Sequence, residues 1–293
     1  MKQKVFTILA AVALALTACT KEPTEQPVAP SGFESYDSVQ MQFKFSPYEV
    51  TPMKTTSSVA TVCSRLDIYI IEQGTTDTMR FHQDRAINAT GFGSLTATLQ
   101  TNRSYKLIVM GHNTSDTCTF RNGLIGFEED KIKQCLYADT VFSPADGLSL
   151  NVVMQRIVGM FKLRIADADD EFADFDHMLF TISESGRKWN TATHESADRG
   201  VRTYSISGHS RGNDGYVTMN LYVMGDDLTT VMYVDITAQS YLTNGTVKET
   251  RQFAQVPIRD GYITTYTGTF YVTFGMGFTF EVGDWNEYGS YTF

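Results

Sequence analysis

Hydrophobic residues alternate with polar ones along most of the chain from Val39 onward, and this pattern limits the possible folds more than any other feature. A period of two places successive side chains on opposite faces, so each run predicts a half-buried antiparallel β-strand. The runs cover 41–45, 66–70, 95–99, 105–111, 148–154, 161–165, 178–182, 204–206, 217–223, 232–236, 270–274 and 278–282. Strands at this spacing, without helices between them, indicate an all-β sandwich architecture.

Interruptions of the alternation predict local features. A weak apolar stripe in Gly123–Tyr137 predicts a short helix, and a phase slip at Gln155-Arg156 predicts a β-bulge. Asn244-Gly245 between two β-rich runs predicts a type I′ hairpin turn. The turn-forming cluster Ser143–Gly147 lies between two series of strands and predicts a domain boundary.

The first 18 residues have the composition of a bacterial lipoprotein signal. Lys2 and Lys4 precede an apolar run too short to span a bilayer stably, which ends in Leu16-Thr17-Ala18-Cys19. This ending is similar to a lipobox, in which the cysteine thiol receives a diacylglyceryl group and becomes the new N-terminus. We expect Cys19 to be lipidated; the alternative is an ordinary signal peptide followed by a chance cysteine.

These features divide the chain into four predicted parts. They are a lipoprotein signal peptide over 1–18, an extended proline-containing linker over 19–38, and β-sandwiches over 39–147 and 148–293.

Charge and cysteine content exclude several classes of protein. A formal net charge of −9 without a basic cluster argues against a nucleic-acid-binding protein. Besides Cys19, the chain has Cys63, Cys118 and Cys135, which allow one disulfide at most. Cys118 and Cys135 are the favoured pair in an oxidising compartment, and three buried reduced thiols are an equal alternative. No spacing suits a zinc site.

Two segments imitate functional motifs. Gly208-His209-Ser210-Arg211-Gly212 matches the GxSxG nucleophile elbow, but a further strand pattern follows it and no histidine occurs after His209. We therefore predict a hairpin loop. Asp167–Asp176 is rich in carboxylates, yet Phe172 stands where a calcium-binding EF-hand requires glycine. A solvated acidic turn with Phe172 and Phe175 facing inward is the favoured interpretation, and calcium binding is the alternative.

The remaining residues give no catalytic constellation. The five histidines, at positions 82, 112, 177, 194 and 209, have no paired spacing, and no glycine-rich phosphate loop is present. We expect no enzymatic activity, no cofactor and no metal site.

Three passages together resemble the Bacteroidales fimbrilin superfamily, in particular its lipid-anchored FimB-type subunits. They are Tyr105–Asn113, Met154–Leu163, and Val256–Arg259 leading into Thr264–Gly268, with Asp284-Trp285 near the end. His112 and the pair Asp260-Gly261 depart from the usual pattern. The resemblance implies two tandem transthyretin-like β-sandwich domains with short helical insertions. It also implies assembly by donor-strand exchange, in which one subunit's strand completes its neighbour's sheet.

The resemblance leads to a functional hypothesis: a surface-exposed outer-membrane lipoprotein that anchors or terminates a fimbria and contributes to cell adhesion. Its partners would be subunits of the same fibre, the membrane through the N-terminal acyl (palmitate-type) chains, and a ligand on a host or bacterial surface. The alternative is a glycan-binding or adhesive lipoprotein that presents aromatic residues such as Trp189, Trp285 or Tyr288 to sugars.

Arginine positions separate an anchor from a stalk subunit. In the superfamily, stalk subunits lose their first strand to a protease that cuts after arginine. This chain has no arginine between Cys19 and Ser64, and Arg65 begins a predicted core strand. We therefore expect the strand at 41–45 to stay in its own sheet, and the segment 278–293 to be available to the next subunit.

Overall fold

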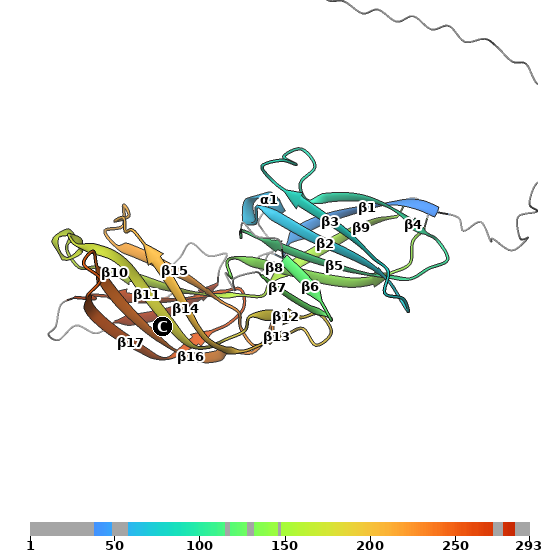
Figure 1. The fold of residues 1–293 in the computed structure, drawn as a ribbon. Helices are drawn as coiled ribbons and strands as arrows, with labels where there is room; N and C mark the ends of the chain where they lie inside the picture. Colours follow the sequence, from blue (N-terminus) through green and yellow to red (C-terminus); the bar gives the residue numbers. More distant parts are fainter. Residues whose placement is uncertain are drawn as a thin grey trace, which may run out of the picture. The chain divides into compact units, whose positions relative to one another are not determined.

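The computed structural model describes residues 38–48, 58–114, 118–127, 132–145, 148–271 and 278–284. All of these described residues belong to one compact unit. The described part is almost entirely β-structure, as the alternation predicts (Figure 1). Its helices are one turn of α-helix, α1 (Val59–Val62), and the 3₁₀ helix η2 (Asp169–Phe172).

The first half of the unit contains nine strands. Seven of them are hydrogen-bonded in the order β3-β2-β5-β8-β9-β1-β4. The strands of this half are β1 (Ser38–Pro47), β2 (Arg65–Glu72), β3 (Thr78–Asp84), β4 (Ser94–Gln100), β5 (Tyr105–His112), β6 (Cys118–Arg121), β7 (Leu124–Phe127), β8 (Cys135–Phe142) and β9 (Ser149–Arg156).

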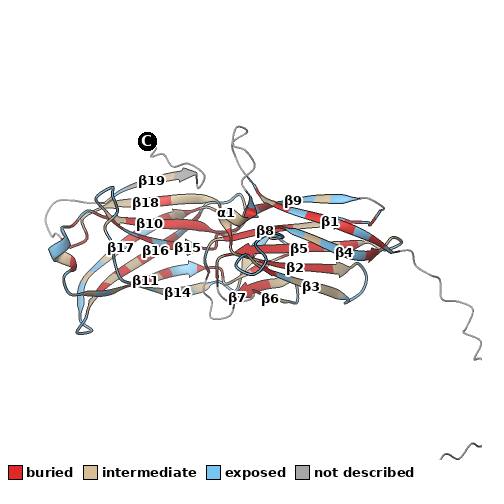
Figure 2. Cartoon of the chain, turned by 90° about the horizontal axis from the view of Figure 1, so that it is seen from above, coloured by how far each residue is buried: buried red, intermediate tan, exposed pale blue. Residues whose placement is uncertain are grey.

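These seven strands enclose a core by folding over at the junction of β8 and β9. The two strands share only the pairs Leu136↔Arg156 and Tyr137↔Gln155, so the sheet divides there into β4-β1-β9 and β3-β2-β5-β8. The inward residues of the two layers form one hydrophobic cluster, in which Met41 and Phe43 of β1 are fully buried. Buried and exposed residues alternate along β1, as expected for a strand with one wet face (Figure 2).

The second half is a sandwich of two four-stranded sheets, β15-β10-β18-β19 and β14-β11-β16-β17, around a second core. Its strands are β10 (Gly159–Ile165), β11 (Phe175–Ser185), β14 (Gly200–Ser207), β15 (Val217–Val223), β16 (Met232–Leu242), β17 (Val247–Ile258), β18 (Tyr262–Gly268) and β19 (Thr279–Asp284). Pro257 lies in β17, an edge strand, where its missing N–H costs no ladder bond inside the sheet.

Both halves repeat one arrangement around their first strand. β1 pairs antiparallel with β4 and parallel with β9, while β10 pairs antiparallel with β15 and parallel with β18. A fourth small sheet, in the order β13-β12-β7-β6, joins strands of both halves. Its later members are β12 (Lys188–Asn190) and β13 (Glu195–Ala197), and β12 pairs with β7.

Four local predictions are corrected by the structure. The described residues of the segment Gly123–Tyr137, which are 123–127 and 132–137, contain β7 and the start of β8 and no helix. The phase slip at 155–156 is not a bulge: the chain leaves one sheet there and enters another, and the adjacent residues Ile157 and Val158 are both buried. The hairpin at 244–245 forms, but only Gly245 has a positive φ, so the turn is not type I′.

The fourth correction concerns β9. Residues 149–156 lie in the first sheet, although they follow the predicted boundary at 147. Because strands of both halves also share the sheet β13-β12-β7-β6, the division into two domains stays a prediction. Of the predicted strand at 270–274, Phe270 and Tyr271 are buried but lie outside any strand, and the rest falls outside the described residues.

Candidate functional site

β1 is an inner strand of its sheet. Its backbone is hydrogen-bonded on one side to β4, from Ser38↔Gln100 to Lys44↔Ser94, and on the other to β9, from Gln42↔Ser149 to Pro47↔Met154. Phe43 also contacts Phe142 across the sandwich, with ring centroids 5.5 Å apart. Removal of β1 would therefore break two strand ladders and open the first core.

Among the described strands, β19 is the outer one of its sheet. It pairs antiparallel with β18, from Tyr262↔Asp284 to Thr267↔Thr279, so residues 279–284 occupy a place in their own sandwich. The expectation that the whole segment 278–293 is free is thus wrong for 279–284. Residues 285–293, which include Trp285 and Tyr288, lie outside the described residues.

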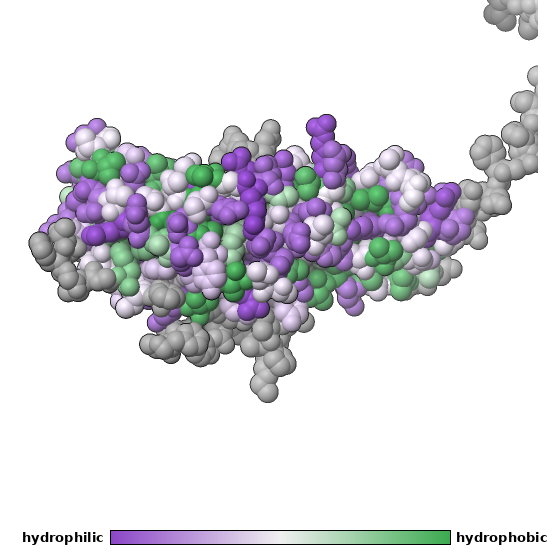
Figure 3. All heavy atoms as spheres, turned by 90° about the horizontal axis from the view of Figure 1, so that it is seen from below, coloured by the Kyte–Doolittle hydropathy of each residue, from purple (hydrophilic) through white to green (hydrophobic). Residues whose placement is uncertain are grey.

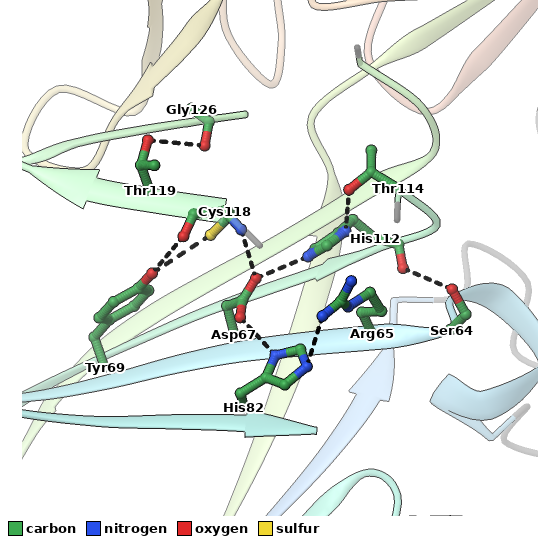
Figure 4. A network of polar contacts seen from close by, with 10 residues as sticks. All are labelled: Ser64, Arg65, Asp67, Tyr69, His82, His112, Thr114, Cys118, Thr119 and Gly126. Carbon is green, nitrogen blue, oxygen red and sulfur yellow. Dashed lines mark hydrogen bonds and ion pairs between the residues drawn. The ribbon is translucent and has the colours of Figure 1, made fainter. Parts of the chain in front are cut away.

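The most extensive polar network lies on the outer face of the first sandwich and centres on Asp67 (Figure 4). Leu66 and Ile68 point into the core, so Asp67 points the other way, yet it is only 2% exposed. It accepts hydrogen bonds from His82 Nδ1 at 2.9 Å, His112 Nε2 at 2.8 Å and the backbone N–H of Cys118 at 2.9 Å. One carboxylate therefore holds together β2, β3, β5 and β6.

The partners of the two imidazoles determine where their protons lie. The Arg65 guanidinium can only donate, and it lies 2.8 Å from His82 Nε2, so His82 carries its proton on Nδ1 and donates it to Asp67. The Thr114 hydroxyl lies 2.6 Å from His112 Nδ1, and His112 donates through Nε2 to the carboxylate. Both tautomers complete the hydrogen bonding of the buried acid.

The network lowers the pKa of Asp67. Burial alone would raise the pKa of this carboxyl, but the hydrogen bonds from His112, Cys118 N–H and His82 stabilise the charged form more strongly. Asp67 is thus an ionised, fully partnered carboxylate beneath the protein surface.

The order Thr114, His112, Asp67 resembles the hydroxyl, imidazole and carboxylate of a hydrolase triad, but its burial gives it a different role. Thr114 is 2% exposed and His112 is 0% exposed, so the hydroxyl has no open approach for a substrate. His112 Nδ1 and the Thr114 hydroxyl form a hydrogen bond with each other in the interior. The arrangement fixes strand positions, because each polar group finds its partner on a neighbouring element.

A surface pocket of about 640 Å³ adjoins this network between β3 and β6. Its lining combines aromatic and basic side chains with the buried carboxylate of Asp67. The lining residues are Asp67, Tyr69, Arg80, Phe81, His82, Cys118, Thr119, Phe120 and Arg121. The Tyr69 hydroxyl donates to Cys118 O at 3.0 Å, and the Tyr69 and Phe120 rings lie 5.0 Å apart. The pocket therefore has a rigid floor and an aromatic wall.

The pentapeptide Gly208–Gly212 forms a loop between β14 and β15, as the sequence predicts. A strand, not a helix, follows it, and Arg211 donates to Asp169 Oδ1 at 2.6 Å. His209 stacks on Phe172 with centroids 4.8 Å apart, so it supports the loop. Ser210 is exposed on this loop.

The acidic segment at 167–176 is partly buried. Phe172 is 1% exposed, as predicted, but Asp167 is 2% exposed instead of solvated. Asp167 accepts from the backbone N–H groups of Phe270 and Tyr271 and so fixes the chain after β18. Within the described ranges, no cluster of three or more histidine, cysteine, aspartate or glutamate side chains could hold a metal ion.

The cysteines and Trp189 are interior residues. Cys63, Cys118 and Cys135 are free, buried thiols, so the favoured Cys118–Cys135 disulfide is not formed. Burial raises the pKa of the Cys63 thiol to about 12 and raises that of Cys118 as well, which leaves both thiols protonated and unreactive.

Trp189 is 0% exposed, and its ring centroid lies 5.7 Å from that of Tyr137, so it cannot present its ring to a sugar.

Among the described residues, no helix is long and apolar enough to cross a membrane. Cys19 lies outside the described residues.

No protein-family profile matches the sequence, and no curated protein matches it significantly. Crystal structures of Bacteroides proteins nevertheless share its fold. A "putative adhesin" from Bacteroides thetaiotaomicron VPI-5482 is 9% identical, with a TM-score of 0.51 over 87% of this chain and 98% of that one. A "putative adhesin" from Bacteroides ovatus is 11% identical, with a TM-score of 0.53 over 83% of this chain and 94% of that one.

A third structure comes from Bacteroides thetaiotaomicron VPI-5482 and is described as "putative polysaccharide binding proteins". It is 9% identical, with a TM-score of 0.52 over 84% of this chain and 98% of that one. At such low identities these comparisons establish a common fold, and all three likenesses extend over most of each chain.

Proposed function

We propose that this protein is an adhesive cell-surface lipoprotein, held to the outer membrane through Cys19, that anchors or terminates a fimbria. The observation that carries the proposal is the position of β1, an inner strand whose inward residues are buried in the first core. A subunit that keeps this strand has no vacant groove at that place for a neighbour's strand. The descriptions of two similar structures as adhesins support the adhesive role.

The arginine distribution supports retention of β1. The chain has no arginine between Cys19 and Arg65, and Arg65 is the first residue of β2, where its backbone is paired with His112 and Asp84. Cleavage after Arg65 would require β2 to leave the sheet. The first strand therefore stays joined to the lipidated N-terminus, and growth of the fibre stops at this subunit.

The outer edge of β19 supports contact with another subunit. β19 ends the order β15-β10-β18-β19, so within the described residues it has a strand on one side only. An open strand edge offers backbone N–H and C=O groups to an added strand. We propose that the neighbouring fibre subunit engages this end of the chain.

Lipidation of Cys19 is the first prediction. We expect mass spectrometry of the mature N-terminal peptide to show an acylated Cys19 as residue one. Two or three acyl chains bury enough methylene groups for stable anchoring, at about 0.8 kcal/mol each, whereas one chain binds a membrane only reversibly. Cys19→Ala should release the protein from the membrane fraction. An unmodified mature N-terminus at any other residue would rule out the lipid anchor.

Retention of β1 is the second prediction. An epitope tag inserted directly after Cys19 should stay on the protein in cells that assemble the fibre. The control is Lys54→Arg, which places an arginine between β1 and β2 and should make the tag removable by an arginine-specific surface protease. Loss of the tag from the unmodified chain, with the protein recovered inside the polymer, would identify a stalk subunit.

A further inference from the structure

Two basic side chains, Arg80 and Arg121, line the pocket between β3 and β6. Arg80 and Arg121 are exposed, and neither makes a hydrogen bond or ion pair to any described residue. Arg80 lies directly opposite Tyr69 in the β2–β3 ladder, and Arg121 ends the short strand β6. Two guanidinium groups thus border one 640 Å³ pocket from different strands.

The Asp67 carboxylate in the pocket does not form an ion pair with Arg80 or Arg121. Asp67 already accepts from His82, His112 and Cys118 N–H, and its side chain is only 3% exposed. The adjoining Arg65 interacts with His82. The pocket therefore has a local positive charge, although the whole chain has a net charge of −9.

The other lining residues supply an apolar, aromatic surface. Phe120 is half-buried, and its ring lies 5.0 Å from the Tyr69 ring, which is held by the bond from the Tyr69 hydroxyl to Cys118 O. Burial raises the pKa of Tyr69, so the hydroxyl stays a neutral donor. Phe120 is itself on β6, whose ladder with β7 fixes the backbone. The aromatic wall is therefore in place before any ligand arrives.

This combination limits the chemistry of a ligand. A planar guanidinium makes paired hydrogen bonds to a carboxylate, and an aromatic face packs against the C–H face of a ring. The pocket is open to solvent, and its volume falls in the usual range for small-molecule sites, about 300–1,000 Å³. A short stretch of a soluble, ring-based polymer fits these conditions better than a lipid chain, which requires a closed apolar cavity.

We propose that the pocket between β3 and β6 binds a carboxylate-bearing sugar, such as a uronate unit of an acidic polysaccharide. Arg80 and Arg121 receive the carboxylate, and the ring packs against Phe120. The Asp67 network below the pocket positions β3 and β6 and does not itself contact the acid group. This inference is independent of β1 retention, because the pocket needs no fibre and no lipid anchor.

Calorimetric titration of the purified protein with trigalacturonate tests the proposal. We expect saturable binding that weakens with added salt, and no comparable binding of the neutral trisaccharide of galactose. Arg80→Gln with Arg121→Gln should weaken binding at least tenfold, because both charge-assisted contacts are lost. Lys44→Gln is the matched control, since Lys44 is an exposed cation on β1 that forms no ion pair with a described residue, and this change should leave binding unchanged.

Phe120→Ala and Phe120→Tyr test the aromatic wall. The alanine variant should weaken binding several-fold, whereas the tyrosine variant, which keeps the ring, should bind like the original protein. Unchanged thermal unfolding midpoints show that each variant is folded. The proposal is overturned if trigalacturonate does not bind at millimolar concentration, if Lys44→Gln weakens binding as much as the double variant, or if neutral trisaccharide binds equally well. Tighter binding of an acidic peptide, such as hexaglutamate, would also overturn it in favour of a protein ligand.

Discussion

Replacing Phe43 with alanine is expected to destabilise the protein by about 3–5 kcal/mol, the usual cost of removing a large aromatic side chain from a core. Phe43 is fully buried in the middle of β1 and contacts Phe142 in an edge-to-face arrangement at 5.5 Å. The substitution leaves a cavity between the two layers of the first sandwich. Urea unfolding followed by the fluorescence of buried Trp189, which contacts Tyr137 of β8, measures the loss.

The matched control for Phe43→Ala is Lys44→Ala at the next position of the same strand. Lys44 faces solvent, so its truncation should change the free energy of unfolding by no more than about 0.5 kcal/mol. Equal effects of the two substitutions would mean that β1 is not part of the stable core. The proposed function would then lose its main support, because a weakly held first strand can be exchanged for a strand of another subunit.

The alternation of apolar and polar residues predicted the strands that have one solvent-exposed face. β1, β4, β10 and β15 fall where the pattern places them, to within a few residues. In each of them the inward residues are a regular series of large apolar side chains, so the sequence contains the necessary information.

Two strands that are covered on both faces, β2 and β5, were also predicted, but the burial of their second face was not. Asp67 and Tyr69 look like the polar face of β2, but they are 2% and 5% exposed. The hairpin β6–β7 covers this face, and its second strand, β7, lies in the segment 123–137, for which the sequence predicts a helix. Local periodicity cannot reveal a covering layer whose position depends on distant pairing, such as that between β7 and β12.

The polar network was not predictable for the same reason. Asp67 lies 15 residues from His82 and 45 residues from His112, and no short motif connects them. The one available signal was His112 itself, which departs from the pattern of the superfamily that the sequence resembles. Its place at the end of β5, directly opposite Arg65, brings its ring to the carboxylate. Long-range strand register, rather than sequence spacing, assembles the site.

Hydropathy alone also gives little indication of the pocket. Figure 3 shows apolar residues on one face of the molecule in small groups between hydrophilic ones. In the pocket the basic and aromatic side chains come from β2, β3 and β6 together, and each strand by itself supplies only a few of them. The sequence-based alternative placed sugar binding on aromatic residues such as Trp189, which is buried, and Trp285 or Tyr288, which lie outside the described residues. The aromatic residues that line the pocket between β3 and β6 are Tyr69, Phe81 and Phe120.

The last prediction concerns the buried acid. Asp67→Asn should destabilise the protein by about 3 kcal/mol near neutral pH, a typical cost of breaking a buried charge network. The asparagine amide must turn its NH₂ group toward at least one of three donors, His82, His112 or Cys118 N–H. That donor then loses its acceptor, at the highest cost for His112 or Cys118 because both are buried, and the favourable charge is also lost.

The pH dependence distinguishes this charge effect from a simple packing defect. Because folding lowers the pKa of Asp67, its contribution to stability is fully present above the unfolded-state pKa, about 4, and disappears as the pH falls through the lower folded-state pKa. The difference in unfolding free energy between the original protein and Asp67→Asn should therefore shrink steadily below about pH 4. Asp170→Asn, at an exposed carboxylate on η2, should show no such difference at any pH. A penalty for Asp67→Asn that stays constant from neutral to acidic pH would show that shape, not charge, is what this position contributes to the fold.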